Sequence, residues 1–286
     1  MAKKHITKDD VYYSNNSNWN KDVNYPGDEN ALEILNNLKI QLKNYKDNLI
    51  DNKYVIETSG GEKINIQFVK KNMPYLLGVD ANKIKETNFF QENFKIEKLH
   101  AYKALELITE DIESSIKINK NFNLNLLNFS RIKTRTEALN NISKKLEKLD
   151  FIIIDHNNDK RKNGTQLKSN KMIAIPSDNN LNYEFSLLGI VDNEDENYTE
   201  TAFLTSNING MVEDQVVSLP MELTIEKDIY TPVKTLSLTK PAMKKRLKEC
   251  RDTLSNYNVH IDTTEMTMRL LEDCMGEEEN EKRKSK

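Results

Sequence analysis

The sequence has no long apolar run, few glycines and prolines, and only two cysteines among its 286 residues. No segment approaches the roughly 18 consecutive apolar residues of a membrane-spanning helix, which excludes a membrane protein of that class. Eight glycines and six prolines are too few for a turn-rich β-sandwich or barrel. Cys250 and Cys274 have neither CxxC spacing nor a neighbouring histidine, which excludes a structural zinc site.

Common targeting and cofactor signatures are absent as well. The opening residues, MAKKHITKDD, contain no apolar signal core, so we expect a cytoplasmic protein whose two thiols stay reduced rather than form a disulfide. No Walker loop, GxGxxG, HExxH, GxSxG or EF-hand loop occurs. We therefore expect no cofactor and no bound metal.

The charge balance excludes a protein that coats nucleic acid through a uniformly basic surface. The net charge is -3, the pI is about 6.0, and charged residues make up 30% of the chain against 37% apolar residues. A local basic groove would still suffice for RNA binding. Apolar residues gather in periodic segments, so the middle of the chain can bury a core while the two ends cannot.

The periodicity of the apolar residues predicts an α+β protein. Helices are expected over 28–49, 97–118 and 131–149, because apolar residues recur there every three to four positions. Strands are expected at 53–58, 63–70, 151–154, 171–175, 183–191 and 199–205, with a further strand within 212–225. Ser59-Gly60-Gly61-Glu62 predicts a hairpin turn. This order predicts N-terminal helices packed on an antiparallel sheet, followed by helices at 242–257 and after Asp262.

Composition divides the chain into four parts. Residues 1–27 are polar and predict a flexible leader, and 28–228 form the α+β domain. Residues 241–276 predict a small helical extension, and 277–286 a disordered charged tail.

Each candidate site residue can be interpreted either as an ordinary structural residue or as a functional one. Of the histidines, His5 is expected to be inert, His100 to be structural, and His156 to be an ordinary loop residue more readily than a site residue. The stretch from Ser130 to Arg135 predicts either a phosphate-binding site at the N-terminus of a helix or simply a helix capped by Ser130 or Thr134.

Basic and aromatic residues on or beside the predicted strands can likewise be interpreted as functional or as structural. Lys168, Lys171 and the pair Lys70-Lys71 flank strands, and together with tyrosines on the sheet they would suit RNA by charge and base stacking. Aromatic residues on strands are more often part of the core.

Residues 54–79 resemble a known family. They contain a strand beginning Tyr-Val-Ile, a strand ending Ile-Gln-Phe, and then Met-Pro-Tyr-Leu-Leu-Gly-Val. This order resembles the predicted phage-borne nucleases of the barnase–EndoU–colicin–RelE-like group, which carry a Phe/Leu-Pro-His-Leu-Leu-Gly motif after a similar strand. The likeness continues through 129–149, 167–189 and 201–206. Tyr75 stands where the family motif has its histidine.

The resemblance implies a metal-independent endoribonuclease, a toxin-like hydrolase of phage or mobile-element origin acting on RNA in a bacterial cytoplasm. In such enzymes a base removes the ribose 2′-hydroxyl proton, an acid protonates the leaving 5′-oxygen, and cations stabilise the phosphorane. By that resemblance we expect catalytic roles for Tyr75, Arg131 and Lys168. We likewise expect substrate-binding roles for Lys133, Arg135, Lys171 and Ser206.

The tyrosine in the motif leaves a second hypothesis open. A tyrosine hydroxyl, with an ordinary pKa of about 10, is a poor base at neutral pH but a usable acid or hydrogen-bond donor. The alternative is a catalytically inactive phage-encoded protein that binds and inhibits a host defence or another host protein. Its partner would be that host protein or an antitoxin, and the C-terminal helices could serve for oligomerisation.

Overall fold

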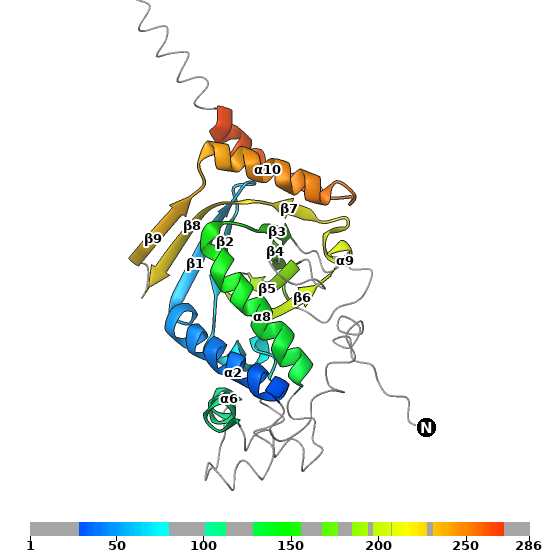
Figure 1. Cartoon of the computed structure of the whole chain (residues 1–286). Coiled ribbons are helices and arrows are strands. Elements are labelled where there is room, and N and C mark those ends of the chain that lie inside the picture. Colours follow the sequence, from blue (N-terminus) through cyan, green and yellow to red (C-terminus); the bar gives the residue numbers. More distant parts are fainter. Residues whose placement is uncertain are drawn as a thin grey trace, which may run out of the picture.

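The computed structural model describes residues 29–79, 101–112, 128–155, 168–176, 185–193, 197–206, 208–227 and 231–271. Within these residues helices pack against two β-sheets (Figure 1), which confirms the predicted α+β class. The expected leader at 1–27 and tail at 277–286 lie outside the described residues. So do His5, His100 and His156.

The larger sheet has six strands in the order β10-β7-β3-β4-β5-β6. The strands are β3 (Ile152–Asp155), β4 (Lys171–Pro176), β5 (Phe185–Asp192), β6 (Asn197–Thr205), β7 (Val216–Ser218) and β10 (His260–Asp262). From β3 to β6 they form the expected antiparallel meander. β7 is antiparallel to β3 and parallel to β10, so the last strand of the described chain closes one edge.

A second sheet of four strands was not predicted. It contains β1 (Asn52–Thr58), β2 (Lys63–Gln67), β8 (Pro220–Lys227) and β9 (Thr231–Ser237) in the antiparallel order β2-β1-β8-β9. The single strand expected within 212–225 is divided into two: β7 belongs to the larger sheet and β8 to the smaller. The β1–β2 hairpin turn is confirmed, and Gly61 adopts a φ of +89° there.

Helices lie on both faces of the larger sheet. They are α2 (Glu29–Asn44) with a π-turn at Tyr45–Leu49, η3 (Lys70–Asn72), α3 (Met73–Leu76), α6 (Ala101–Glu110), α8 (Phe129–Lys145) with η4 (Leu146–Lys148), α9 (Asn209–Val212) and α10 (Lys240–Leu254). Of these, α2 and α8 lie on one face and α9 and α10 on the other. α8 lies across β4, β5 and β6, and α2 packs beside it (Figure 1). Of the helices in the described part of the chain, none has both the length and the apolarity to cross a membrane.

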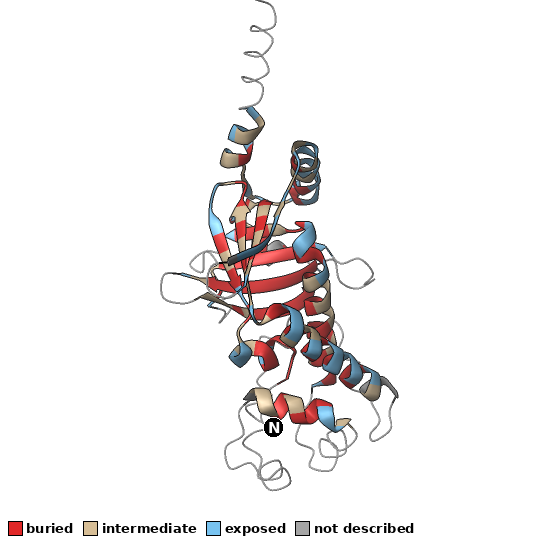
Figure 2. Ribbon diagram, turned by 90° about the vertical axis from the view of Figure 1, so that its left-hand side faces the viewer, coloured by how far each residue is buried: buried red, intermediate tan, exposed pale blue. Residues whose placement is uncertain are grey.

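Alternation along the strands divides the apolar residues into two cores. Ile173 and Ile175 of β4 belong to the core under α2 and α8, whereas Met172 and Ala174 belong to the core under α10. The strands between these cores are buried over most of their length (Figure 2). Each fully buried large apolar side chain contributes about 1.5–3 kcal/mol to folding.

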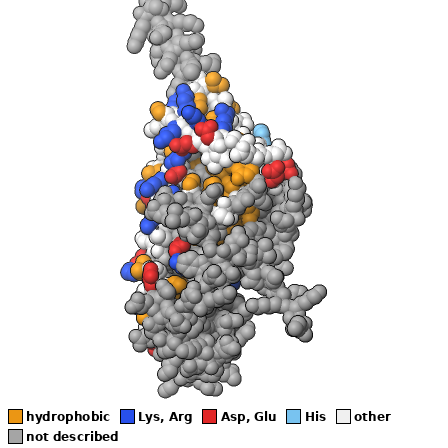
Figure 3. All heavy atoms as spheres, turned by 45° about the vertical axis from the view of Figure 1, so that its right-hand side comes forward, with side chains coloured by type: hydrophobic (Ala, Val, Ile, Leu, Met, Phe, Trp, Pro, Cys, Tyr) orange, Lys and Arg blue, Asp and Glu red, His pale blue; other side chains and the backbone are white. Residues whose placement is uncertain are grey.

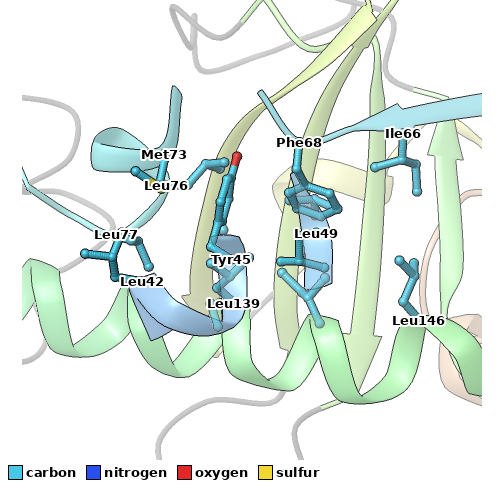
Figure 4. Close-up of a cluster of buried hydrophobic side chains, with 14 of the residues drawn as sticks. Leu42, Tyr45, Leu49, Ile66, Phe68, Met73, Leu76, Leu77, Leu139 and Leu146 are labelled. Atoms are coloured by element: carbon cyan, nitrogen blue, oxygen red, sulfur yellow. The ribbon is translucent and has the colours of Figure 1, made fainter. Parts of the chain in front are cut away.

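The π-turn after α2 packs inside the first core, against the smaller sheet. Tyr45 packs edge-on against Phe68 with ring centroids 5.7 Å apart, beside Leu42, Leu49 and Leu139 (Figure 4). Its hydroxyl donates a hydrogen bond of 3.1 Å to the carbonyl oxygen of Val69. Burial raises the pKa of Tyr45 above its ordinary value. The phenol therefore remains a neutral hydrogen-bond donor that holds the chain where it leaves β2.

The segment expected as a C-terminal extension packs onto both sheets. Residues Met243, Cys250 and Leu254 of α10 are buried in the second core, and Met266 joins them from a helical segment at 264–271. The β1–β2 turn is tied to this segment through Ser59, whose hydroxyl donates to the carbonyl oxygen of Asp262 and whose carbonyl accepts from the Met266 amide at 3.0 Å.

We expect the thiol of Cys250 to be unreactive while the protein is folded. The residue is 4% exposed, and burial raises its pKa to about 11, so little reactive thiolate is present near neutral pH. In a Cys274→Ser background, native protein at pH 8 should react with iodoacetamide at least about 10-fold more slowly than protein unfolded in guanidinium. Equal rates in the two states would show that α10 does not shield the thiol.

Candidate functional site

The short helix α3 presents Tyr75 at the surface. Pro74 stands in its first turn, where a missing backbone N–H is tolerated. Met73, Pro74 and Leu76 are buried, while Tyr75 is 39% exposed. The preceding turn is tied to the larger sheet, because the side-chain amide of Asn72 donates to the carbonyl oxygen of Thr199 in β6 at 3.0 Å.

A glycine lets α3 approach the start of α8 closely. Gly78 has a φ of +83°, and an added Cβ would lie 2.6 Å from the carbonyl oxygen of Arg131 and 2.9 Å from the Cα of Ile132. No side chain fits at that distance. The backbone after Tyr75 therefore rests directly on the first turn of α8.

This approach places two arginines against Tyr75. The guanidinium carbon of Arg135 lies 4.4 Å from the centre of the Tyr75 ring, and that of Arg131 lies 5.0 Å from it. The two arginines are four residues apart, so they share one face of α8. Arg135 is only 2% exposed, and its Nη1 donates to the Tyr75 carbonyl oxygen at 2.8 Å. Arg131 is half-buried.

The residue that caps the N-terminus of α8 is neither of the two expected from the sequence. Asn128 caps the helix, since its side-chain oxygen accepts from the Arg131 amide at 2.9 Å. Ser130 lies inside the first turn, and the Thr134 hydroxyl donates back to the Ser130 carbonyl oxygen at 3.0 Å. The expectation of Ser130 or Thr134 as the cap is therefore wrong.

Two lysines in η3 repeat the pairing of a cation with a tyrosine ring. The Nζ of Lys70 lies 4.3 Å from the centre of the Tyr102 ring on α6, and that of Lys71 lies 5.4 Å from the centre of the Tyr198 ring on β6. Both lysines are exposed, and in the residues that the structure describes neither takes part in an ion pair.

These residues form one surface because η3 and α3 contact α6, α8 and β6. We call it the tyrosine–cation surface, made of Lys70, Lys71, Tyr75, Tyr102, Arg131 and Tyr198, with the buried Arg135 against the Tyr75 ring. Tyr102 and Tyr198 were missed as site residues, since no local pattern shows that a tyrosine on a distant element will face a lysine.

Lys133 lies on a different side of α8 from the two arginines. It is two residues from each of them, about 200° around the helix. It influences Glu137, four residues on, whose pKa is raised by burial, lowered by Lys133 and raised by the carboxylate of Glu33 on α2. The face that carries Lys133 is therefore the one near α2.

Lys171 and Lys168 lie at the start of β4 and meet carboxylates. Lys171 is 6% exposed, with its Nζ 2.7 Å from the Glu62 carboxylate and 3.3 Å from that of Asp155. Lys168 is exposed, and its backbone amide donates to the carboxylate of Glu200 at 2.9 Å. The ion pairs neutralise the charge of Lys171, which leaves it unsuited to a phosphate.

Ser206 is exposed just after β6, far from Lys171. Lys171 pairs with Ile190, which pairs with Thr199, so Lys171 is level with the beginning of β6. Ser206 is seven residues further along, roughly 23 Å away at the rise of a strand. Of the seven predicted site residues, the structure thus brings together Tyr75, Arg131 and Arg135. Lys133 lies across α8 from the two arginines, Lys171 is ion-paired, and Ser206 lies at the opposite end of β6 from Tyr198. Lys168 contacts Glu200, two residues from Tyr198.

Among the residues that the structure describes, no three histidine, cysteine or acidic side chains are grouped so that they could hold a metal ion. His260, the one histidine within the described ranges, is exposed on β10. Comparison with protein-family models, with curated proteins and with solved structures finds no match for this chain.

Proposed function

We propose that the protein is a metal-independent endoribonuclease-like protein of phage or mobile-element origin that binds RNA at the tyrosine–cation surface. The observation that carries the proposal is that the exposed Tyr75 lies beside the guanidinium groups of both Arg131 and Arg135. Tyrosine rings beside cations suit a single-stranded nucleic acid, because bases stack on the rings while Arg and Lys bind phosphates. The exposed side chains of Lys70 and Lys71 extend the positive surface.

The proposed reaction uses the residues at Tyr75 in separate roles. The ribose 2′-oxygen attacks phosphorus and forms a new P–O bond while the bond to the 5′-oxygen breaks, giving a 2′,3′-cyclic phosphate and a free 5′-hydroxyl. The 2′-hydroxyl proton leaves to solvent, and the Tyr75 hydroxyl gives its proton to the leaving 5′-oxygen. Arg131 stabilises the phosphorane charge. Arg135 is buried and holds the Tyr75 backbone, so it positions the tyrosine.

A second candidate function is supported by the position of the other predicted bases. Lys171 is neutralised by two carboxylates, and Lys133 lies across α8 from the arginines that contact Tyr75. A catalytically inactive protein that binds and inhibits a host protein would need no convergence of these groups. In that case the tyrosine–cation surface would contact an acidic partner.

The test is cleavage of a labelled single-stranded RNA in excess EDTA. Arg131→Ala and Tyr75→Phe should each lower the cleavage rate at least about 10-fold, since each removes an interaction with the reacting phosphate. The control is Lys63→Ala, which removes an exposed charge at the start of β2, the end of that strand away from η3. Intact RNA at high concentrations of the unaltered protein would overturn the nuclease proposal and favour the inhibitor.

A further inference from the structure

A second cationic surface lies on α10. The helix is anchored by Met243, Cys250 and Leu254, and most of its remaining surface faces solvent. Six of its fifteen residues are basic and two are acidic, although the whole chain has a net charge of -3. In the space-filling view, Lys and Arg side chains gather at this end of the molecule (Figure 3).

Three of these cations have no partner in the described part of the chain. Lys244, Lys248 and Arg251 are exposed, and no hydrogen bond or ion pair to another described residue engages their side chains. Their spacing of four and then three residues aligns them on one face of the helix over about 10 Å. We call them the α10 stripe. By contrast, Arg246 pairs with Asp150 and Glu249.

The α10 stripe is separate from the tyrosine–cation surface. Arg246 of α10 contacts Asp150, just after the C-terminal end of α8, whereas Tyr75 contacts the N-terminal turns of α8. Because α8 has 17 residues, the two ends are about 25 Å apart. A ligand that touches both surfaces must be long and carry negative charge along its length.

The exposed face of α10 favours a nucleic-acid backbone over a protein. Its exposed residues are Pro241, Lys244, Lys245, Lys248, Glu249, Arg251, Asp252 and Thr253. They include none of the aromatic, methionine or leucine side chains that form the buried centre of a protein–protein interface. A row of unpaired cations on such a face matches a phosphate backbone, which is bound mainly through charge.

We propose that the α10 stripe is a second, sequence-independent contact for the phosphate backbone of RNA, which holds the strand while another part of it lies at the tyrosine–cation surface. The inference rests on the proposed function for its RNA substrate. It predicts that affinity depends on RNA length, because an RNA too short to span about 25 Å can use one of the two surfaces only.

The test compares two variants of equal net charge. The first is the triple variant Lys244→Ala, Lys248→Ala and Arg251→Ala. The matched control changes Lys39, Lys63 and Lys227 to alanine, three exposed lysines on α2, β2 and β8 that form no ion pair with a described residue. Binding of a labelled 30-nucleotide RNA is measured by fluorescence anisotropy between 50 and 200 mM salt, and melting temperature verifies that both variants are folded.

The triple variant should bind the long RNA about 10-fold more weakly at low salt. The slope of log K against log salt should fall by about 2, near 0.7 for each lost phosphate contact. The control variant should keep the slope of the unaltered protein, and a three-nucleotide RNA, too short to span the two surfaces, should bind the triple variant and the control equally. Equal slopes for the two variants with the long RNA would overturn the proposal, as would poly-glutamate competing at the stripe as strongly as RNA.

The outcome separates this inference from the proposed function. If RNA stays intact but the triple variant loses affinity and slope, the nuclease proposal fails and the α10 contact stands. If cleavage depends on Tyr75 while the triple variant behaves as the control does, the nuclease proposal stands and the α10 contact fails.

Discussion

Replacing Gly78 by alanine should lower the free energy of unfolding by about 4 kcal/mol. A non-glycine residue at a φ of +83° costs about 1–2 kcal/mol. Forcing a methyl group into a closed space costs a further 1–3 kcal/mol or so. All three atoms nearest to the added Cβ are backbone atoms of Arg131 and Ile132, which cannot rotate away as a side chain can. The loop after α3 must therefore move off α8.

The matched control is Gly61→Ala in the β1–β2 turn. Gly61 has nearly the same φ, +89°, but the nearest atom to its added Cβ is 3.5 Å away, an ordinary contact. Urea unfolding should give a loss of about 1–2 kcal/mol there, from backbone strain alone. Similar losses in the two variants would mean that the contact between α3 and α8 adds nothing. The Gly78 variant should also bind RNA more weakly, because Tyr75 and Arg131 would no longer be held together.

Replacing Arg135 by alanine should lower the free energy of unfolding by about 3 kcal/mol. The side chain is among the largest that are fully buried, so truncation leaves a cavity. It also removes the cation from the Tyr75 ring and the donor from the Tyr75 carbonyl oxygen. Urea unfolding measures the loss, and the RNA assay should show weakened binding through Tyr75, which Arg135 positions.

Two variants separate the contributions of Arg135. Arg131→Ala, which truncates the half-buried arginine on the same ring, should cost less than about 1 kcal/mol. Arg135→Met keeps most of the buried volume but loses charge and donor, so it should fall between the other two variants. If Arg135→Ala is no more destabilising than Arg131→Ala, Arg135 does not hold α3 in place.

Local periodicity explains why most elements could be predicted from the sequence. The apolar face of the first helix is the buried face of α2, from Ile34 to Leu42, and it continues into the π-turn at Tyr45 and Leu49. Alternation of Ile64, Ile66 and Phe68 predicted β2 together with its buried side. These patterns depend on neighbours within a few residues, and the folded chain keeps them.

The division into two sheets depends on distant contacts and had no local signal. The segment from Val216 to Ile225 has mostly strand-type residues, and Pro220 marks a break without showing that the chain changes sheets at Leu219. There the carbonyl oxygen of Leu219 accepts from the Ser59 amide at 2.7 Å, and its amide donates to the Ser59 hydroxyl at 2.9 Å. Ser59 is 160 residues away in the sequence. β9 was missed because its exposed, proline-bearing sequence is typical of an edge strand.

The candidate site, like the fold, could be predicted only where it depends on local spacing in the sequence. The i, i+4 spacing of Arg131 and Arg135 places both on one side of a helix, and the motif drew attention to Tyr75. Helical periodicity also contains the signal that separates Lys133 from them, since a two-residue step crosses the helix. Nothing near Lys171 in the sequence shows that Glu62, 109 residues earlier, will neutralise it.

The hydrogen bond between Ser59 and Asp262 joins residues 203 positions apart, which sets an order for events on the ribosome. At about 5–20 residues per second, the intervening chain takes roughly 10–40 s to synthesise. Throughout that interval the hairpin turn at Gly60 and Gly61 has no Asp262 or Glu265 against it, and in the last part of it the completed β7 has no β10 beside it. The growing polypeptide must therefore wait with an open sheet edge, the kind of surface at which nascent chains associate wrongly.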